Sequence, residues 1–375
     1  MSVENARLPE VPLDEFPAFH KHVCPPTFEG GPLDPVTPTV TMERKLAVGI
    51  QVEFPDGAKL DRWCIEDNRD SAKGKTFPSK LCRTVEGDIV HATVSAAVNT
   101  HTIHWHGIEP SPMNDGVGKH SFEFSSRFTY QFATSQAGTY FLHCHKNTPL
   151  HFERGLYGFF IVDPKKPATP EASGVPNPPY PTGGPGFVAA QNPPSNVRKY
   201  DVEALWAFDE IDTRWNELDH DAFMQACDPD DPISARNFTQ NGILNNFRPD
   251  VFTISGALRR QNDTTPFNEV TVKAKVGQTI LLRILNAGYT VQEYRVGLPS
   301  EVIAMDGHSL GVPPVNAYSH PFKRAANEPF RLTSAMRHDL LVQATAPGQF
   351  PVECRMLHWI SGKELFVART FIDIT

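Results

Sequence analysis

The sequence predicts an all-β protein made of two Greek-key β-sandwich domains in tandem. The chain of 375 residues holds 34 prolines and 25 glycines and few long patterns of helical period, which favours short strands joined by turns. Runs such as GDIVHATVSAAV, GTYFLHCH, GFFIVD and EVTVKAKVGQTILLRIL are rich in β-branched and aromatic residues, as strands are. The length is sufficient for two domains that each bury a core.

An internal repeat supports the prediction of two domains. VEGDIVHATVSAAVNTHTIHWHG aligns with KVGQTILLRILNAGYTVQEYRVG, which sets Gly87 on Gly277. Near the domain ends, AGTYFLHCH aligns with PGQFPVECR, which sets Cys144 on Cys354. A repeat of this size indicates a duplicated domain, and two β-sandwiches are the simplest arrangement.

Composition divides the chain into four segments. We expect a proline-rich N-terminal arm over residues 1–40 and a first domain over 41–164. The segment PKKPATPEASGVPNPPYPTGGPG is too rich in proline and glycine to pack as an element, so residues 165–198 are interpreted as a linker. The second domain then covers residues 199–375.

Charge and hydropathy exclude several classes of partner. A net charge of −8 and a pI near 6.0 argue against nucleic acid, which requires a basic face. No segment is apolar over the length needed to span a membrane. The first residues, MSVENARLPEVPLDEF, do not have the pattern of a signal peptide. Cys64 and Cys82 are spaced so that a disulfide across a loop is possible, and the sequence leaves this open.

Two short motifs carry histidines at alternate positions: THTIHWHG at 100–107 and HCH at 143–145. Successive side chains of a strand point to opposite faces. His101 and Cys144 therefore point away from the other histidines of their motifs. If the two strands are neighbours, one face carries four imidazoles, from His104, His106, His143 and His145.

The opposite face has the residues of a blue-copper site. His151, seven residues after Cys144, adds a second histidine to His101. Two histidines and one cysteine thiolate in a trigonal arrangement are typical of copper sites that transfer electrons. The four imidazoles on the other face suit copper or zinc. A lone histidine or cysteine usually has only a structural role, but seven at these offsets favour metal binding over that alternative.

The quoted residues resemble a known family. HTIHWHG together with GTYFLHCHKNTPLHFERGLYGFFIV is similar to the paired copper motifs of multicopper oxidases, whose domains are cupredoxin β-sandwiches. The resemblance is strong over residues 41–164 and weaker in the second half. It implies that His101, Cys144 and His151 are type 1 copper ligands. Leu156 falls at the axial position, where a side chain that cannot ligate should raise the reduction potential relative to methionine.

In the same family His104 would serve a type 2 copper, and His106, His143 and His145 a type 3 pair. A complete trinuclear cluster requires four further histidines from a second domain. The second half lacks them: it has Val291, Tyr294 and Val296 at the positions of the first motif, and Glu353 and Arg355 at those of the second. Dioxygen reduction by a complete cluster is therefore in doubt.

Two-domain copper nitrite reductases offer a different template, in which a trimer completes a mononuclear type 2 site between subunits. On this pattern His106 and His143 match type 2 ligands, and His308 in MDGHSL takes the place of a catalytic histidine. His358 in RMLHW is the nearest candidate for the third ligand. The alternative is that both are solvated loop histidines. Asp115 in NDGVG resembles the acidic residue that follows HWHG in the family and is a candidate for proton supply.

The sequence thus predicts a copper-dependent oxidoreductase of the multicopper oxidase family. Electrons from a small molecule or a redox protein would enter at the type 1 copper and pass to a histidine-ligated second copper site that reduces O2. The alternatives are a nitrite-reductase-like trimer and a non-catalytic type 1 electron-transfer protein. We expect no nucleic-acid partner, a homo-oligomer with a trimer favoured, and a periplasmic or secreted location because such copper enzymes mostly work outside the reducing cytosol.

Overall fold

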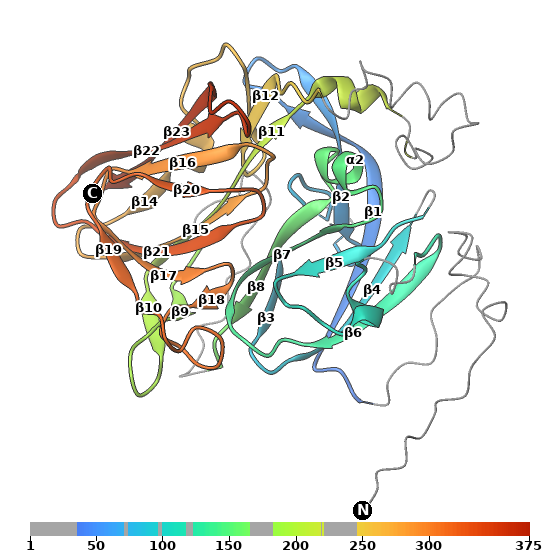
Figure 1. Ribbon diagram of the computed structural model, residues 1–375, viewed down its shortest axis with the longest axis horizontal. Helices are drawn as coiled ribbons and strands as arrows, with labels where there is room; N and C mark the ends of the chain where they lie inside the picture. Colours follow the sequence, from blue (N-terminus) through green and yellow to red (C-terminus); the bar gives the residue numbers. More distant parts are fainter. Residues whose placement is uncertain are drawn as a thin grey trace, which may run out of the picture.

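The structure is a computed structural model that describes residues 36–70, 74–96, 100–117, 123–165, 183–218, 220 and 246–375. Two β-sandwiches lie side by side (Figure 1). The prediction of an all-β fold with two tandem cupredoxin-like domains is confirmed. Most of the expected N-terminal arm lies outside the described residues. Among those residues, no helix has both the length and the apolar character that a membrane crossing requires.

The first sandwich consists of two four-stranded sheets. One has the order β2 (Lys59–Asp67), β1 (Val40–Glu53), β4 (Ile89–Ala96) and β6 (Arg127–Ala133). The other has the order β3 (Cys82–Val85), β8 (Tyr157–Asp163), β7 (Gly138–Cys144) and β5 (Ile103–His106). The pairs β1–β4 and β3–β8 are parallel and the others antiparallel. The short helix α2 (Thr148–Glu153) joins β7 to β8.

The second sandwich repeats this topology. One sheet contains the order β12 (Val251–Ile254), β11 (Val202–Ile211), β15 (Thr279–Asn286) and β21 (Arg337–Gln343), extended at its edges by β13 (Ala257–Arg260), β17 (Ser300–Met305), β18 (His308–Ser309) and β19 (Phe322–Arg324). The other has the order β14 (Val272–Ala274), β23 (Glu364–Ile374), β22 (Gly348–Leu357), β16 (Val291–Val296) and β20 (Phe330–Leu332). The parallel pairs β11–β15 and β14–β23 correspond to those of the first domain. The chain therefore contains a duplicated domain.

The segment expected to be a linker contains two strands. β9 (Gly186–Ala189) lies inside residues 165–198 and pairs antiparallel with β10 (Val197–Tyr200), which begins there, so the expectation that nothing packs in this segment is corrected. The physical reason is that Val188 and Tyr200 are buried in one cluster with Leu281 and Ile303 of the second domain. Apolar side chains at these positions outweigh the surrounding prolines and glycines.

Strand β7 is buried at every position because it lies between two cores. Leu142 and Cys144 face the interior of the first sandwich. Phe141, on the opposite face, packs in a cluster that includes Leu205 and Leu285 of the second domain. Such continuous burial is typical of strands covered on both faces. His143, two residues after Phe141 on the same face of β7, is therefore set next to the boundary between the domains.

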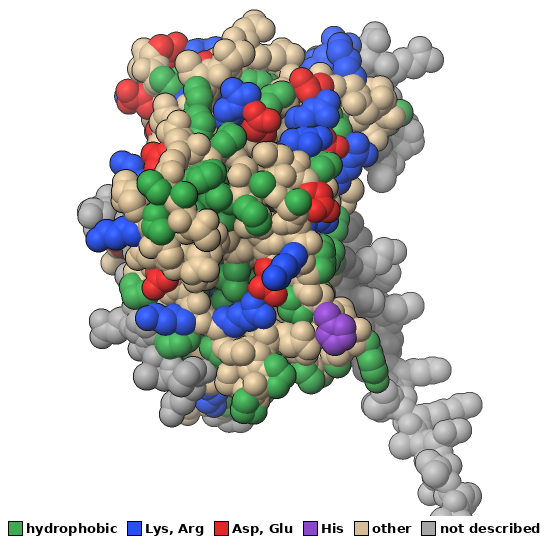
Figure 2. All heavy atoms as spheres, turned by 90° about the vertical axis from the view of Figure 1, so that its left-hand side faces the viewer, with side chains coloured by type: hydrophobic (Ala, Val, Ile, Leu, Met, Phe, Trp, Pro, Cys, Tyr) green, Lys and Arg blue, Asp and Glu red, His purple; other side chains and the backbone are tan. Residues whose placement is uncertain are grey.

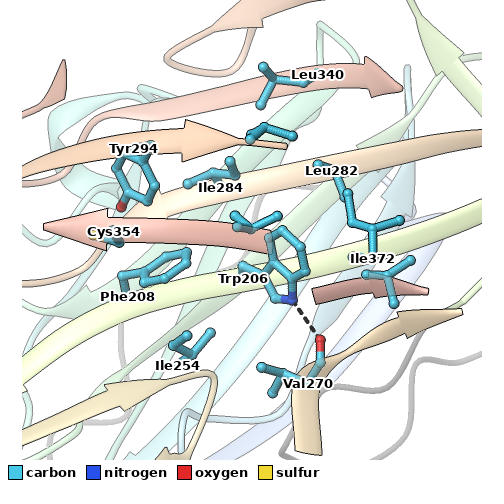
Figure 3. Close-up of a cluster of buried hydrophobic side chains, with 14 of the residues drawn as sticks. Trp206, Phe208, Ile254, Val270, Leu282, Ile284, Tyr294, Leu340, Cys354 and Ile372 are labelled. Atoms are coloured by element: carbon cyan, nitrogen blue, oxygen red, sulfur yellow. Dashed lines mark hydrogen bonds between the residues drawn. The ribbon is translucent and has the colours of Figure 1, made fainter. Parts of the chain in front are cut away.

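The interior of the second domain is apolar around Cys354, the counterpart of Cys144 (Figure 3). Cys354 lies there near Tyr294 and Phe208, and burial raises the pKa of its thiol well above the ordinary value. Trp206 donates a hydrogen bond from Nε1 to the Val270 carbonyl, at 3.1 Å. Cys354 is a core side chain, and Cys64 and Cys82 are also buried free thiols, so the possible disulfide between them is not formed.

The pairing of strands corrects the repeat alignment by one residue. Tyr294 lies opposite Cys354, whereas Ile103 lies opposite Cys144. The counterpart of His104 is therefore Arg295 instead of Tyr294. The second domain has one residue more between the end of β15 and Tyr294 than the first has between the end of β4 and Ile103, which an alignment without gaps does not reveal. The absence of a histidine at the corresponding position is unchanged.

Candidate metal centres

The antiparallel neighbours β5 and β7 separate the predicted ligands into two groups. His104 lies opposite His143, and Ile103 lies opposite Cys144. Alternation along the two strands then sends the side chains of His104 and His143 to one face and that of Cys144 to the other. His101 precedes β5 and is held by paired backbone hydrogen bonds with Phe124, both 2.9 Å long.

The first group contains His101, Cys144 and His151, whose ligand atoms all lie within 4.8 Å of one another. The Nδ1 atoms of His101 and His151 lie 3.4 and 3.3 Å from the Cys144 sulfur. Bonds of about 2.0 Å to nitrogen and about 2.3 Å to sulfur, about 120° apart, would separate such atoms by about 3.7 Å. A buried set of two imidazoles and one thiol at these distances fits a type 1 copper ion.

The surroundings of this group are apolar and fully covered. Leu156 is 1% exposed, and its carbonyl accepts a hydrogen bond from the Cys144 amide at 3.0 Å. Burial raises the pKa of the Cys144 thiol to about 12. Its sulfur lies 3.6 Å from the Lys146 carbonyl. Because copper binds the thiolate, metal binding at this site must release the thiol proton.

The second group contains His104, His106 and His143, with ligand atoms again within 4.8 Å of one another. Hydrogen bonds fix two of the three tautomers. His104 donates from Nδ1 to the Asp115 carboxylate at 2.8 Å, and His143 donates from Nδ1 to the Cys144 carbonyl at 3.0 Å. Each of these rings therefore presents the lone pair of Nε2 toward the group, where Nε2 of His143 lies 3.5 Å from Nδ1 of His106.

Burial keeps the imidazoles of His106 and His143 in their neutral form. It lowers the pKa of His106 to about 2, with a further contribution from the Arg337 guanidinium, and the pKa of His143 to about 3, with a contribution from His104. Burial lowers the pKa of His145 as well. A neutral imidazole is the form that binds metal. The three imidazoles of the group, within reach of one another, fit a mononuclear copper or zinc ion.

His145 is adjacent to the second group without being part of it. Its ring centroid lies 5.6 Å from that of His104 and 5.7 Å from that of His143. The side chain is only half-buried. The four-histidine face expected from the sequence therefore consists of three close imidazoles and a fourth at its edge.

Asp115 is buried and hydrogen-bonded to the second group. Its Oδ1 accepts from His104 Nδ1 at 2.8 Å and from the Trp105 amide at 3.3 Å. A carboxylate on the outer nitrogen of a ligating histidine orients the ring and increases its basicity. The contact gives Asp115 an orienting position, whereas the sequence suggested proton supply.

His308 lies at the boundary between the domains of its own chain. Its Nδ1 is 3.0 Å from Oε1 of Gln136 in the first domain, and its ring is 6.1 Å from that of Tyr140. A pocket of about 350 Å³ opens there, lined by His106, Glu109, Asp306, His308, Met336 and Arg337 among others. His308 therefore shares a pocket with His106 without a neighbouring subunit.

His358 lies apart from both groups in the described part of the chain. Its Nδ1 accepts hydrogen bonds from the amides of Ile360 and Ser361, both at 3.2 Å, and its ring stacks on Trp359 with centroids 4.2 Å apart. This side chain caps the turn between β22 and β23. A role for His358 as a ligand stays a prediction that depends on a second subunit.

Two residues near the centres were not singled out in the sequence. Arg337 donates to the Thr139 carbonyl at 3.2 Å and lies 5.5 Å from the centre of the Phe141 ring, beside His106. His220 lies against His101 and His151, with ring centroids at 4.7 and 4.3 Å. No local sequence motif marks either residue. Each comes near the proposed ligands only because the second domain packs against the first.

The second-domain residues at the ligand positions form ion pairs instead. Arg355 contacts Glu293 at 3.0 Å and Glu364 at 2.7 Å, and Arg369 contacts Glu353 at 2.6 Å. Acidic and basic side chains also adjoin one another on the face of the second domain shown in Figure 2. These positions cannot supply imidazoles to a trinuclear cluster.

Comparison with known proteins agrees with this fold and these sites. Among solved structures, the blue copper oxidase from Nitrosomonas europaea superposes with a TM-score of 0.59 at 20% identity, covering 89% of this chain and 85% of that one. The copper nitrite reductase from Nitrosomonas europaea superposes with a TM-score of 0.55 at 17% identity, covering 89% and 93%. At these identities the likeness defines the class of fold, a two-domain cupredoxin protein.

Sequence comparison adds the family. A family model described as multicopper oxidase matches residues 69–167, which carry both histidine motifs. The L-ascorbate oxidase of Cucumis sativus is 36% identical over 108 residues, 27% of this chain and 18% of that protein. The multicopper oxidase MmcO of Mycobacterium tuberculosis is 26% identical over 294 residues, 74% of this chain and 48% of that protein. The resemblance to multicopper oxidases is confirmed, since residues 69–167 match the family model and the relatives imply copper as the cofactor. The chain spans less than half the length of these relatives.

Proposed function

We propose that the chain is a copper-dependent oxidoreductase that takes electrons from a small donor at a type 1 site and passes them to a second, histidine-ligated site that reduces O2. One observation carries the proposal: two ligand groups lie back to back on the paired strands β5 and β7, and the adjacent residues Cys144 and His143 belong one to each group. Bound copper would supply one-electron chemistry at each group.

The chain itself supplies a short path between the groups. His143 follows Leu142 and precedes Cys144 directly, and its Nδ1 donates a hydrogen bond to the Cys144 carbonyl at 3.0 Å. The two ligands are thus connected both through the backbone and through this hydrogen bond. The outer partners, Asp115 and the Cys144 carbonyl, keep the Nε2 lone pairs of His104 and His143 directed inward.

The geometry favours a mononuclear second site. Three imidazoles are close together, and the second domain has Arg295, Glu353 and Arg355 where further histidines would be needed. The pocket beside His106 is the proposed access route for the acceptor. It contains Glu109 and Asp306 as acids and His308 as a neutral imidazole, whose pKa is lowered by burial and by Arg337.

The same pocket supports a second candidate, a nitrite-reductase-like enzyme. His308 and Arg337 line it together with His106, so an anionic acceptor such as nitrite would meet a guanidinium and an imidazole. A trimer in which His358 of a neighbouring subunit completes the second site belongs to this candidate.

A third candidate, a type 1 electron-transfer protein without turnover, is supported by the missing second-domain histidines. For each candidate we propose a periplasmic or secreted location, because thiolate copper sites suit compartments outside the reducing cytosol.

Copper content with electron paramagnetic resonance tests these candidates directly. We expect two coppers per chain, with separate type 1 and type 2 signals. His106→Ala should remove the type 2 signal and leave the type 1 signal, whereas His320→Ala, a change at an exposed histidine bonded to Gln191, should remove neither.

Assays with O2 and with nitrite then separate the candidates. Turnover of O2 by the wild type and its loss in His106→Ala would support the oxidase. Turnover of nitrite alone, lost in His308→Ala as well, would support the reductase. One copper per chain and no turnover would overturn both in favour of the electron-transfer protein.

A further inference from the structure

We propose that His220, a residue of the second domain, is a positioning residue of the type 1 site that fixes the tautomers of both copper-binding imidazoles and closes their outer edge. The inference rests on the proposed function only for the identity of the metal. Its basis is a set of hydrogen bonds and ring contacts that join His220 to His101, His151 and Trp63.

The backbone of His220 determines the tautomer of His151. Nε2 of His151 lies 3.1 Å from the His220 carbonyl oxygen, which can only accept. Nε2 of His151 must therefore carry the proton, and the lone pair of its Nδ1 faces the Cys144 sulfur 3.3 Å away. Asn147, which precedes α2, donates to the same carbonyl at 3.2 Å and so connects His220 to the ligand loop.

The side chain of His220 has the corresponding role at His101. The Nε2 atoms of the two rings are 3.0 Å apart, so one must donate to the other. The Nδ1 of His101, 3.4 Å from the Cys144 sulfur, has to present a lone pair to a metal. His101 therefore donates from Nε2, and Nε2 of His220 accepts. A partner of this kind outside the ligand shell controls the basicity of the ligand as well as its orientation.

Ring contacts hold His220 in this position. Its ring stacks on Trp63 with centroids 5.6 Å apart and an interplanar angle of 24°, and lies 4.7 Å from His101 and 4.3 Å from His151. Under this cover His101 is 4% exposed and His151 is fully buried. His220, itself half-buried, thus stands between the imidazoles and solvent. The first domain supplies all the ligands, while the second domain supplies the residue that orders them.

The tautomers can be read in the copper-free protein by long-range 15N–1H correlation of the imidazole nitrogens. In the wild type we expect both His101 and His151 to be protonated at Nε2. In His220→Ala the backbone carbonyl remains, so His151 should keep its tautomer while His101 changes to a mixture of both. His220→Gln, which retains an acceptor oxygen, should restore the wild-type pattern at His101. His320→Ala is the matched control and should change neither ring.

A spectroscopic readout on the copper-loaded protein adds an independent comparison. We expect the type 1 reduction potential and the thiolate-to-copper absorption band to shift in His220→Ala and to return toward wild-type values in His220→Gln. An unchanged His101 tautomer together with an unchanged potential in His220→Ala would overturn the inference. A wild-type protein without a type 1 band would contradict the proposed function instead, and the copper-free tautomers would still decide the role of His220.

Discussion

At the scale of single residues, histidines of both proposed sites are oriented by the hydrogen bonds that their outer nitrogens make. The outer nitrogen of His104 donates to Asp115, that of His143 to the Cys144 carbonyl and that of His151 to the His220 carbonyl. Each bond leaves the inner nitrogen free as a ligand. The ligands follow from spacing in the sequence, whereas these partners do not.

Asp115→Asn should weaken metal binding at the second site. The neutral amide is a poorer acceptor for His104 Nδ1 and allows the other tautomer, and loss of such a partner typically reduces metal affinity about 10- to 100-fold. Copper competition titration with the type 2 signal as readout measures the effect. The control is Asp306→Asn, which removes a charge from the pocket beside His106 without a contact to His104. Equal losses in both variants would contradict an orienting role for Asp115.

Leu156→Met should lower the midpoint potential of the type 1 site. A thioether sulfur at this buried position adds a weak axial ligand that stabilises the oxidised metal, which leucine cannot do. A redox titration of the absorption band gives the potential. Leu340→Met, a similar exchange in the core of the second domain, should leave it unchanged. An unchanged or raised potential in Leu156→Met would count against the axial assignment.

At the scale of elements, the paired strands β5 and β7 carry the proposed ligands on two faces, and both faces are covered. The face of Cys144 packs into the first sandwich and the face of Phe141 packs against the second domain. The N-terminal end of β7 lies against the backbone of that domain. A Cβ on Gly138 would lie 1.8 Å from the Gly307 carbonyl oxygen, in the turn between β17 and β18.

Gly138→Ala should therefore separate β7 from this turn. Backbone contacts cannot give way as a flexible side chain does, and overpacking of this kind costs about 1–3 kcal/mol. We expect a lower thermal midpoint and a weaker type 2 signal, since His143 follows in the same strand. Calorimetry and resonance spectra measure the two effects. A thermal midpoint equal to that of the wild type would show that the two backbones can move apart without cost.

The sequence was sufficient for the strands and their faces but not for contacts between the domains. Alternation predicted that His104 and Cys144 point to opposite sides, because that depends only on the two-residue period of a strand. The strands β9 and β10 were missed because the prolines around them dominated the composition of residues 165–198. The positions of His308 and His220 depend on the docking of the second domain, which no local pattern encodes.

At the scale of the whole molecule, a buried ionic network joins the two domains. Arg283 contacts Glu203 at 2.7 Å and Asp339 at 3.1 Å, and it donates to Thr139 of the first domain at 2.8 Å. Arg83 of the first domain contacts Glu203 at 2.7 Å. Buried charges of this kind are stable only while every partner is present. Glu203 is thus the carboxylate that links an arginine of each domain.

Glu203→Gln should destabilise the protein by about 3–5 kcal/mol at neutral pH, because the buried Arg283 and the half-buried Arg83 lose their shared partner. Burial opposes ionisation of Glu203, but Arg283 and Arg83 outweigh it and lower its pKa to about 2. Since the folded pKa is below the unfolded value of about 4.3, the stabilisation is present above the unfolded pKa and is lost as the pH falls toward 2. Denaturant unfolding measures the free energy of unfolding, and the difference in this free energy between wild type and variant should be smaller at pH 3 than at pH 7.

The control is Glu301→Gln, at a half-buried pair with Arg198, which should cost less than about 1 kcal/mol at either pH. A pH-independent difference for Glu203→Gln would contradict the ionised state of its carboxylate.

The alternation that separates the two ligand groups makes the paired strands sensitive to any change of length. One residue added within β5 or β7 would turn the side chains beyond it to the opposite face of the sheet, so both proposed sites would lose members at once. The extra residue of the second domain lies before β16, and Tyr294 and Cys354 keep the pairing that Ile103 and Cys144 have. A difference in length is thus accommodated ahead of the paired strands, where it leaves the face of each side chain unchanged.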